Sequence, residues 1–91
     1  MKNVTIETVV KAREEMLQRL YMYALEHGAT PMPAGEFPEK IDDNVRAFNI
    51  YYLREGGYIA EEPVSPGGEP GYRVTAQGIR LFEELYGKYN I

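Results

Sequence analysis

The sequence predicts an α+β domain that is mostly helical, with three helices and a two-stranded β-hairpin. Two stretches without Gly or Pro carry apolar residues at helical spacing, and a third stretch follows a threonine that can cap a helix. Two short β-prone runs, separated by a loop rich in Pro and Gly, precede that threonine. Because 91 residues is the length of one small domain, we expect a single domain over residues 1–91.

The first predicted helix covers residues 8–27. Its apolar residues recur at helical spacing: Val9, Ala12, Met16, Leu20 and Tyr23. Further apolar positions widen this stripe, so we expect the helix to be packed on more than one side. Gly28 then supplies a residue that can end the helix in a left-handed conformation.

The second predicted helix follows a segment that is poor in regular structure. Residues 28–38 contain three prolines and two glycines, so we expect a loop there with at most one short turn. Pro38 can occupy the first position of a helix that runs through residues 39–55 and ends at Gly56 and Gly57. A helical projection predicts that one broad side is core: Ile41, Val45, Phe48, Asn49, Tyr52 and Leu53.

The hairpin and the third helix complete the predicted domain. Residues 58–60 and 71–74 are the two β-prone runs, and the long loop between them has the composition of a turn. Thr75 can cap a last helix over residues 76–89. Its apolar stripe contains Ile79, Phe82, Leu85, Tyr86 and Tyr89.

Two local motifs connect this layout to a known family. The first is Leu-x-x-x-Gly-Tyr-Ile at residues 53–59, and the second is Tyr-x-Val-Thr-x-x-Gly at residues 72–78. With these motifs the chain resembles the winged helix-turn-helix family, including PadR-like and MarR-like regulators. In size and layout it is similar to small uncharacterised YjcQ-like winged-helix proteins. The resemblance implies a winged-helix domain whose helix around residues 39–55 enters the major groove of DNA.

The face of that helix opposite its predicted core side carries groups that suit DNA. Together with one residue of the second wing strand, the candidate DNA-binding residues are Lys40, Asn44, Ala47, Tyr51, Arg54 and Arg73. Asn44 can pair with adenine and Ala47 can contact a thymine methyl group. Tyr51 completes the reading face, and the three basic residues can anchor phosphates.

These residues favour a DNA-binding transcriptional regulator, for which duplex DNA is the expected partner. Charge argues against it, because residues 39–56 contain three basic and four acidic side chains, and Glu61, Glu62 and Glu69 surround the wing. The alternative is a winged-helix protein-protein interaction module without DNA binding, of phage or mobile-element origin. The acidic wing and the tyrosines would then contact a protein partner.

The apolar surface of the terminal helices predicts a homodimer. It exceeds what one small core should need, and it comprises Val10, Leu17, Ala24, Phe82, Tyr86 and Tyr89. The eight tyrosines, spread over all predicted helices and the hairpin, have the spacing of core edges or of a dimer interface.

Composition excludes several other classes of function. The chain has no cysteine, and its only histidine, His27, and only serine, Ser65, lie far apart in sequence, so we expect no enzyme, no metal site and no cofactor. No apolar run approaches the ~20 residues of a membrane span. Charged residues also interrupt the first sixteen positions, unlike a secretory signal. We therefore expect a cytoplasmic protein without membrane contact.

Overall fold

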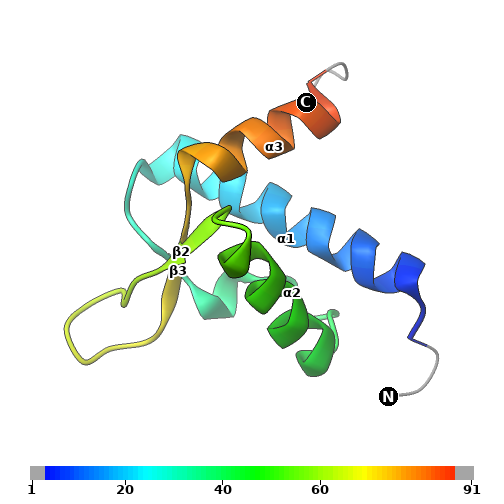
Figure 1. Ribbon diagram of the computed structural model, residues 1–91. Coiled ribbons are helices and arrows are strands. Elements are labelled where there is room, and N and C mark those ends of the chain that lie inside the picture. The colour runs from blue at the N-terminus through cyan, green and yellow to red at the C-terminus, as the bar shows by residue number, and fades with distance from the viewer. Residues whose placement is uncertain (1–3, 88–91) are drawn as a thin grey trace.

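The structure, a computed structural model, describes residues 4–87 and confirms the α+β class. In chain order the elements are helix α1 (Ile6–His27), strand β1 (Met32–Pro33), the short 3₁₀ helix η1 (Ala34–Glu36), helix α2 (Asp43–Glu55), strands β2 (Ile59–Glu61) and β3 (Gly71–Val74), and helix α3 (Ala76–Tyr86). In Figure 1, α1 runs between α3 and α2, and the loop between β2 and β3 projects away from the helices. This layout is compatible with a small winged-helix-like fold.

Helix α1 begins two residues before the predicted start because Thr5 caps it. The Thr5 hydroxyl accepts a hydrogen bond from the backbone N–H of Thr8 at 3.1 Å, which satisfies one of the first amides of the helix. The predicted end is confirmed. Gly28 has a φ of 70°, and its N–H donates to the carbonyl of Ala24 at 2.8 Å.

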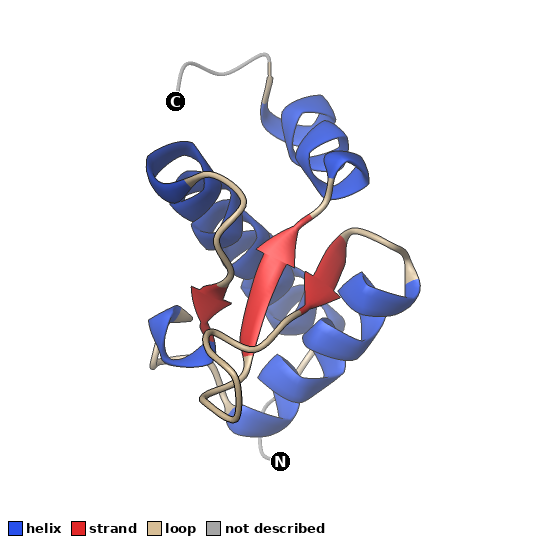
Figure 2. Cartoon of the chain, turned by 90° about the vertical axis from the view of Figure 1, so that its left-hand side faces the viewer, coloured by secondary structure: helices blue, strands red, loops and turns tan. Residues whose placement is uncertain are grey.

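The sheet has three antiparallel strands, one more than the predicted hairpin provides. Strand β3 lies in the middle, between β1 and β2 (Figure 2). The one short turn expected before Pro38 is present as η1, but strand β1 within residues 28–38 was not predicted. Strand β1 is two residues long, and Met32 pairs with Tyr72, which lies forty positions further along the chain. Proline is tolerated in it because an edge strand leaves one row of N–H positions unpaired.

Helix α2 begins at Asp43, five residues after the predicted first position at Pro38. The carboxylate of Asp42 accepts hydrogen bonds from the N–H groups of Asn44 and Val45, at 2.9 and 3.3 Å. A carboxylate that accepts from two amides is a strong N-cap, and it fixes the start of the helix. Lys40 consequently precedes α2 and does not lie on it.

The connection from the hairpin to α3 agrees with the prediction. The Thr75 hydroxyl accepts from the N–H of Gly78 at 3.1 Å and donates to the carbonyl of Gly57 at 2.6 Å. Gly57 has a φ of 76°, a conformation that favours glycine, and it turns the chain from α2 into β2. Helix α3 ends at Tyr86, and the predicted stripe residue Tyr89 lies outside the described residues.

All three helices and β1 contribute to one core. Its most deeply buried side chains are Met16, Leu17, Leu20, Met32, Asn49, Leu53 and Phe82. The ring of Phe82 lies between those of Tyr21 and Tyr86, with centroid distances of 4.5 and 4.7 Å. Burial is the main reason why the pKa of Tyr86 is raised to about 12, and a hydrogen bond to Glu14 is the second reason. These contacts join α3 to α1.

The burial of Leu17 and Phe82 alters the surface predicted for a homodimer. Both side chains are at most 2% exposed and belong to the core of one chain, so they cannot contact a second copy. Their helical spacing suggested a second apolar face, but α1 and α3 use it to pack against each other. The large apolar side chains that these two helices leave exposed are Ile6, Val10, Met22, Leu25 and Leu85.

Candidate interaction surface

A buried stripe of three residues fixes the orientation of α2. Val45, Asn49 and Leu53 recur every four residues and are all buried. They lie on the side of α2 that packs on the rest of the domain, where α2 contacts α1 and β2. The other sides of α2 face solvent, and they include the face on which the sequence places candidate DNA contacts.

Asn49 links α2 to α1 through two hydrogen bonds. Its Oδ1 accepts from Nε of Arg13 at 3.1 Å, and its Nδ2 donates to the backbone carbonyl of Val9 at 3.1 Å. An unsatisfied buried amide costs about 1–3 kcal/mol, so the two bonds favour the arrangement in which Asn49 meets this turn of α1. The prediction that Asn49 lies on the core side is confirmed.

The prediction that Phe48 and Tyr52 are core residues is wrong. Their side chains are 52% and 42% exposed. Around the helix axis they lie about 100° and 60° from Asn49, on the same side of the buried stripe. Neighbouring elements cover only that stripe, so both rings remain in contact with solvent. A helical projection gives the direction of each side chain but not the width of the covered strip.

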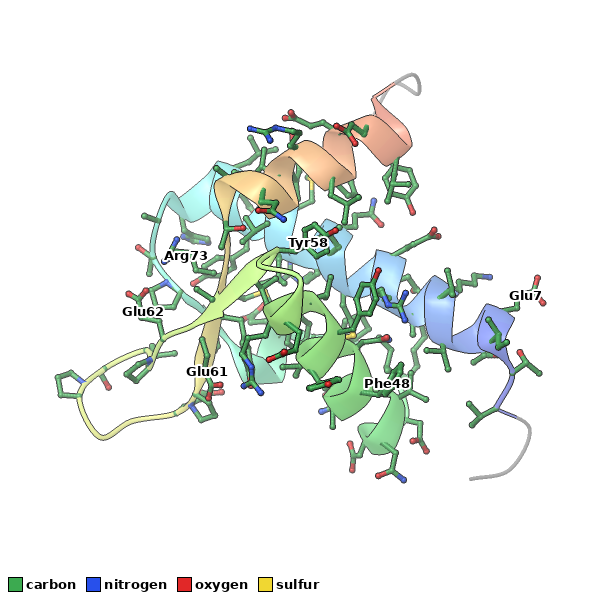
Figure 3. All side chains as sticks on the ribbon, in the orientation of Figure 1. Glu7, Phe48, Tyr58, Glu61, Glu62 and Arg73 are labelled. Carbon is green, nitrogen blue, oxygen red and sulfur yellow. The ribbon has the colours of Figure 1, made fainter. Side chains whose placement is uncertain are left out.

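Three aromatic residues on one side of α2, together with Tyr58 just after the helix, make up what we call the aromatic surface: Phe48, Tyr51, Tyr52 and Tyr58. Tyr51 is 56% exposed, and the rings of Tyr52 and Tyr58 stack with a centroid distance of 6.4 Å and an interplanar angle of 24°. The guanidinium carbon of Arg13 lies 3.9 Å from the centroid of the Tyr52 ring, within cation–π range. Figure 3 labels two of the four residues, Phe48 on α2 and Tyr58 before β2.

Four of the six candidate DNA contacts share an exposed face of α2. They are all exposed and follow one another at intervals of three and four residues: Asn44, Ala47, Tyr51 and Arg54. Lys40 does not belong to this face, because it precedes the helix. Its Nζ lies 2.9 Å from Oε2 of Glu15 on α1, so its positive charge is already paired.

The two candidate arginines are also paired with carboxylates. Nη1 of Arg54 lies 2.7 Å from Oε1 of Glu61, and Nε of Arg73 lies 3.2 Å from Oε1 of Glu62. Figure 3 shows both glutamates where the loop between β2 and β3 begins. A phosphate near either arginine would compete with the glutamate for the guanidinium charge, which lowers the electrostatic gain from the phosphate.

The segment from α2 to the wing is acidic as a whole. Residues 42–73 contain six acidic side chains and three arginines, which gives this segment a net charge of −3. The third arginine, Arg46, binds the carboxylate of Asp43 at 2.6 Å. Such a surface repels a phosphate backbone over roughly a Debye length, about 8 Å at physiological salt, and attracts cationic groups.

A groove of about 550 Å³ lies between α1 and the start of α2. Charges of both signs line it: Glu7, Lys11, Glu15, Lys40 and Asp42. Because acidic and basic side chains both line the groove, it favours neither an anionic nor a cationic ligand. Among residues 4–87, no group of three or more His, Asp or Glu side chains is placed to hold a metal ion. In the same part of the chain, no helix combines the length and apolarity needed to cross a membrane.

Sequence reasoning placed Tyr51 on an exposed face of the second helix but assigned Phe48 and Tyr52 to its core side, so it found only part of the aromatic surface. Tyr51 and Tyr52 are adjacent, and consecutive helical residues point about 100° apart. A narrow buried stripe cannot cover both rings, so at least one of them had to be exposed. The position at which α1 crosses α2 then decides which of the other aromatic residues are exposed as well.

Comparison with protein-family models, with curated proteins and with solved structures finds no match for this chain.

Proposed function

We propose that this protein is a winged-helix-like module that binds another protein through the aromatic surface and performs no catalysis. One observation supports the proposal above all. The exposed part of α2 presents Phe48, Tyr51 and Tyr52 to solvent, whereas the candidate phosphate anchors are already bound to carboxylates. The surface thus offers exposed aromatic rings to a partner and little unpaired positive charge.

Exposed aromatic rings on a rigid helix suit a protein interface. Aromatic residues are enriched at interface centres, and tyrosine carries an apolar ring with a hydroxyl that tolerates water. Such residues often dominate the binding free energy. Here Asn49 holds α2 against α1, and the stack with Tyr58 supports Tyr52. Little conformational entropy would be lost when a partner covers these rings.

Loss of the Tyr51 side chain should release the protein partner. We expect affinity capture from cells that naturally contain this protein to recover a partner in the presence of nuclease. Tyr51→Ala should reduce the recovery at least about fivefold, as expected for an interface residue worth more than about 1 kcal/mol. Leu25→Ala is the matched control, because Leu25 is 66% exposed near the far end of α1. Equal recovery with Tyr51→Ala would contradict the proposal.

A second candidate is a DNA-binding regulator, which one observation favours. Asn44, Ala47 and Tyr51 lie exposed on one face of α2, the helix that the winged-helix resemblance places in the major groove. In this hypothesis Arg54 and Arg73 exchange their glutamate partners for phosphates. The exchange replaces one charge pair by another, so its net gain is small.

An anisotropy titration of a mixed duplex DNA pool at several salt concentrations separates the two candidates. A regulator should bind with a log-log salt slope of about two to four in magnitude, and Arg54→Glu should abolish binding to any selected duplex. The protein-interaction module should show no binding even at low salt. Full retention of duplex binding by Arg54→Glu would remove Arg54 from any DNA-binding face.

A further inference from the structure

The residues of the aromatic surface that lie on α2 have the spacing at which a second helix packs. Phe48, Tyr51, Tyr52 and Glu55 occupy positions i, i+3, i+4 and i+7, so they lie on one side of the helix over two turns. Rows of side chains at these intervals are the ridges that interlock between packed helices. All four residues are exposed, although Arg13 of α1 and Tyr58 contact the ring of Tyr52.

Charge next to the aromatic surface selects the kind of helix that fits. The carboxylate of Glu55 makes no ion pair with the residues of the described chain, 4–87. The arginines of residues 42–73 are bound to Asp43, Glu61 and Glu62, and this segment keeps a net charge of −3, which becomes −2 when Arg13 over the ring of Tyr52 is included. A partner with Lys or Arg beside its apolar residues would complement this border, whereas one with Glu or Asp would be repelled.

The tyrosines add a second reason for a basic partner. Arg13 already lies over the ring of Tyr52 at 3.9 Å, which shows that a guanidinium group is accommodated at this surface. Tyr51 has no aromatic or cationic neighbour at stacking distance among the residues of the described chain and is 56% exposed. Its ring can accept a cation from a partner in the same manner.

From these observations we propose that the occupant of the aromatic surface is a basic amphipathic helix of another protein, with an apolar stripe flanked by Lys and Arg. This inference rests on the proposed function and names the partner's chemistry. Its apolar stripe covers Phe48 and Tyr52, and its basic flank meets Glu55 and the ring of Tyr51. A second copy of this chain fits poorly, because two aromatic surfaces brought together would place two acidic segments against each other.

Three labelled synthetic helical peptides test the proposal. They share one stripe of Leu and Trp and carry Lys/Arg, Gln or Glu at the flanking positions. Anisotropy titrations with the intact chain should give a dissociation constant for the basic peptide about tenfold below that of the acidic one at low salt, a difference of about 1.4 kcal/mol. At about 1 M salt, where the Debye length is about 3 Å, the three constants should converge.

Two variants separate the apolar contribution from the charged one. Phe48→Ala should raise the dissociation constants of all three peptides at least about fivefold. Glu55→Gln should reduce the preference for the basic peptide about threefold and leave the Gln peptide unchanged. Both side chains are exposed, so thermal unfolding should be unaltered. Leu25→Ala is again the control and should change no constant.

Three results would overturn the inference. Tighter Phe48-dependent binding of the Gln or Glu peptide would exclude a basic partner, and binding that ignores Phe48→Ala would exclude the aromatic surface as the helix site. If light scattering shows a homodimer that Phe48→Ala dissociates, the occupant of the surface is a second copy of this chain.

The proposed function has a separate test: it fails if Tyr51→Ala still captures the protein partner. Capture that is lost with Tyr51→Ala while the peptides show no basic preference would overturn only the inference.

Discussion

Gly78→Ala is expected to lower the free energy of unfolding by about 2–3 kcal/mol. An added Cβ would lie 2.1 Å from the backbone carbonyl oxygen of Tyr58 and 2.8 Å from Cγ2 of Val74. The carbonyl cannot move aside easily, because it already accepts a hydrogen bond from the N–H of Thr75 at 3.0 Å. Overpacking of this kind outweighs the roughly 1 kcal/mol that alanine gains over glycine in helix propensity.

Urea denaturation followed by circular dichroism measures this effect. Gly35→Ala is the matched control, because its Cβ would meet only a side-chain oxygen of Glu69 at 3.5 Å. We expect that control to remain within about 0.5 kcal/mol of the parent chain. Unchanged or higher stability of Gly78→Ala would show that α3 does not approach the start of β2 as closely as the structure places it.

Asn49→Ala is expected to destabilise the domain by about 2–3 kcal/mol. The substitution removes both hydrogen bonds between α2 and α1, leaves a cavity at a fully buried position and deprives Nε of Arg13 of its acceptor. Since Asn49 also sets the angle at which α2 presents the aromatic surface, partner binding should weaken together with stability.

Asn44→Ala provides the comparison on the same helix. Asn44 is exposed, so its loss should change the free energy of unfolding by less than about 0.5 kcal/mol. A double-mutant cycle between Arg13→Ala and Asn49→Ala should give a coupling energy of about 1 kcal/mol. Additive effects in that cycle would show that the hydrogen bond from Arg13 does not stabilise the fold.

The elements predicted correctly are those whose determinants are close together in sequence. Helix α1 follows from one uninterrupted apolar stripe, and the start of α3 follows from the hydroxyl of Thr75, which reaches an amide three residues later. Strand β1 was missed because its two residues, one of them Pro33, have no local β pattern. Only the pairing of Met32 with Tyr72 makes this segment a strand.

The candidate site was predicted in part, and the errors have a common physical origin. Asn44, Ala47 and Tyr51 are exposed on one face of α2 as expected. Phe48 and Tyr52 are outside the core because only a narrow strip of α2 is covered. The paired states of Lys40 and Arg54 could not be foreseen, since Glu15 lies on another helix and Glu61 on the wing.

The sequence by itself determined the α+β class, the three helices, the hairpin and the acidic character of the chain. These properties depend on spacing, capping and composition, which act between residues near one another in the chain. Only the tertiary structure decided that the aromatic residues Phe48 and Tyr52 lie outside the core and that the candidate phosphate anchors are bound to carboxylates. Burial and ion pairing depend on how distant segments meet. Where α2 meets α1, Asn49 is covered and the neighbouring rings are left to solvent, and where α2 meets the wing, Arg54 is bound to Glu61.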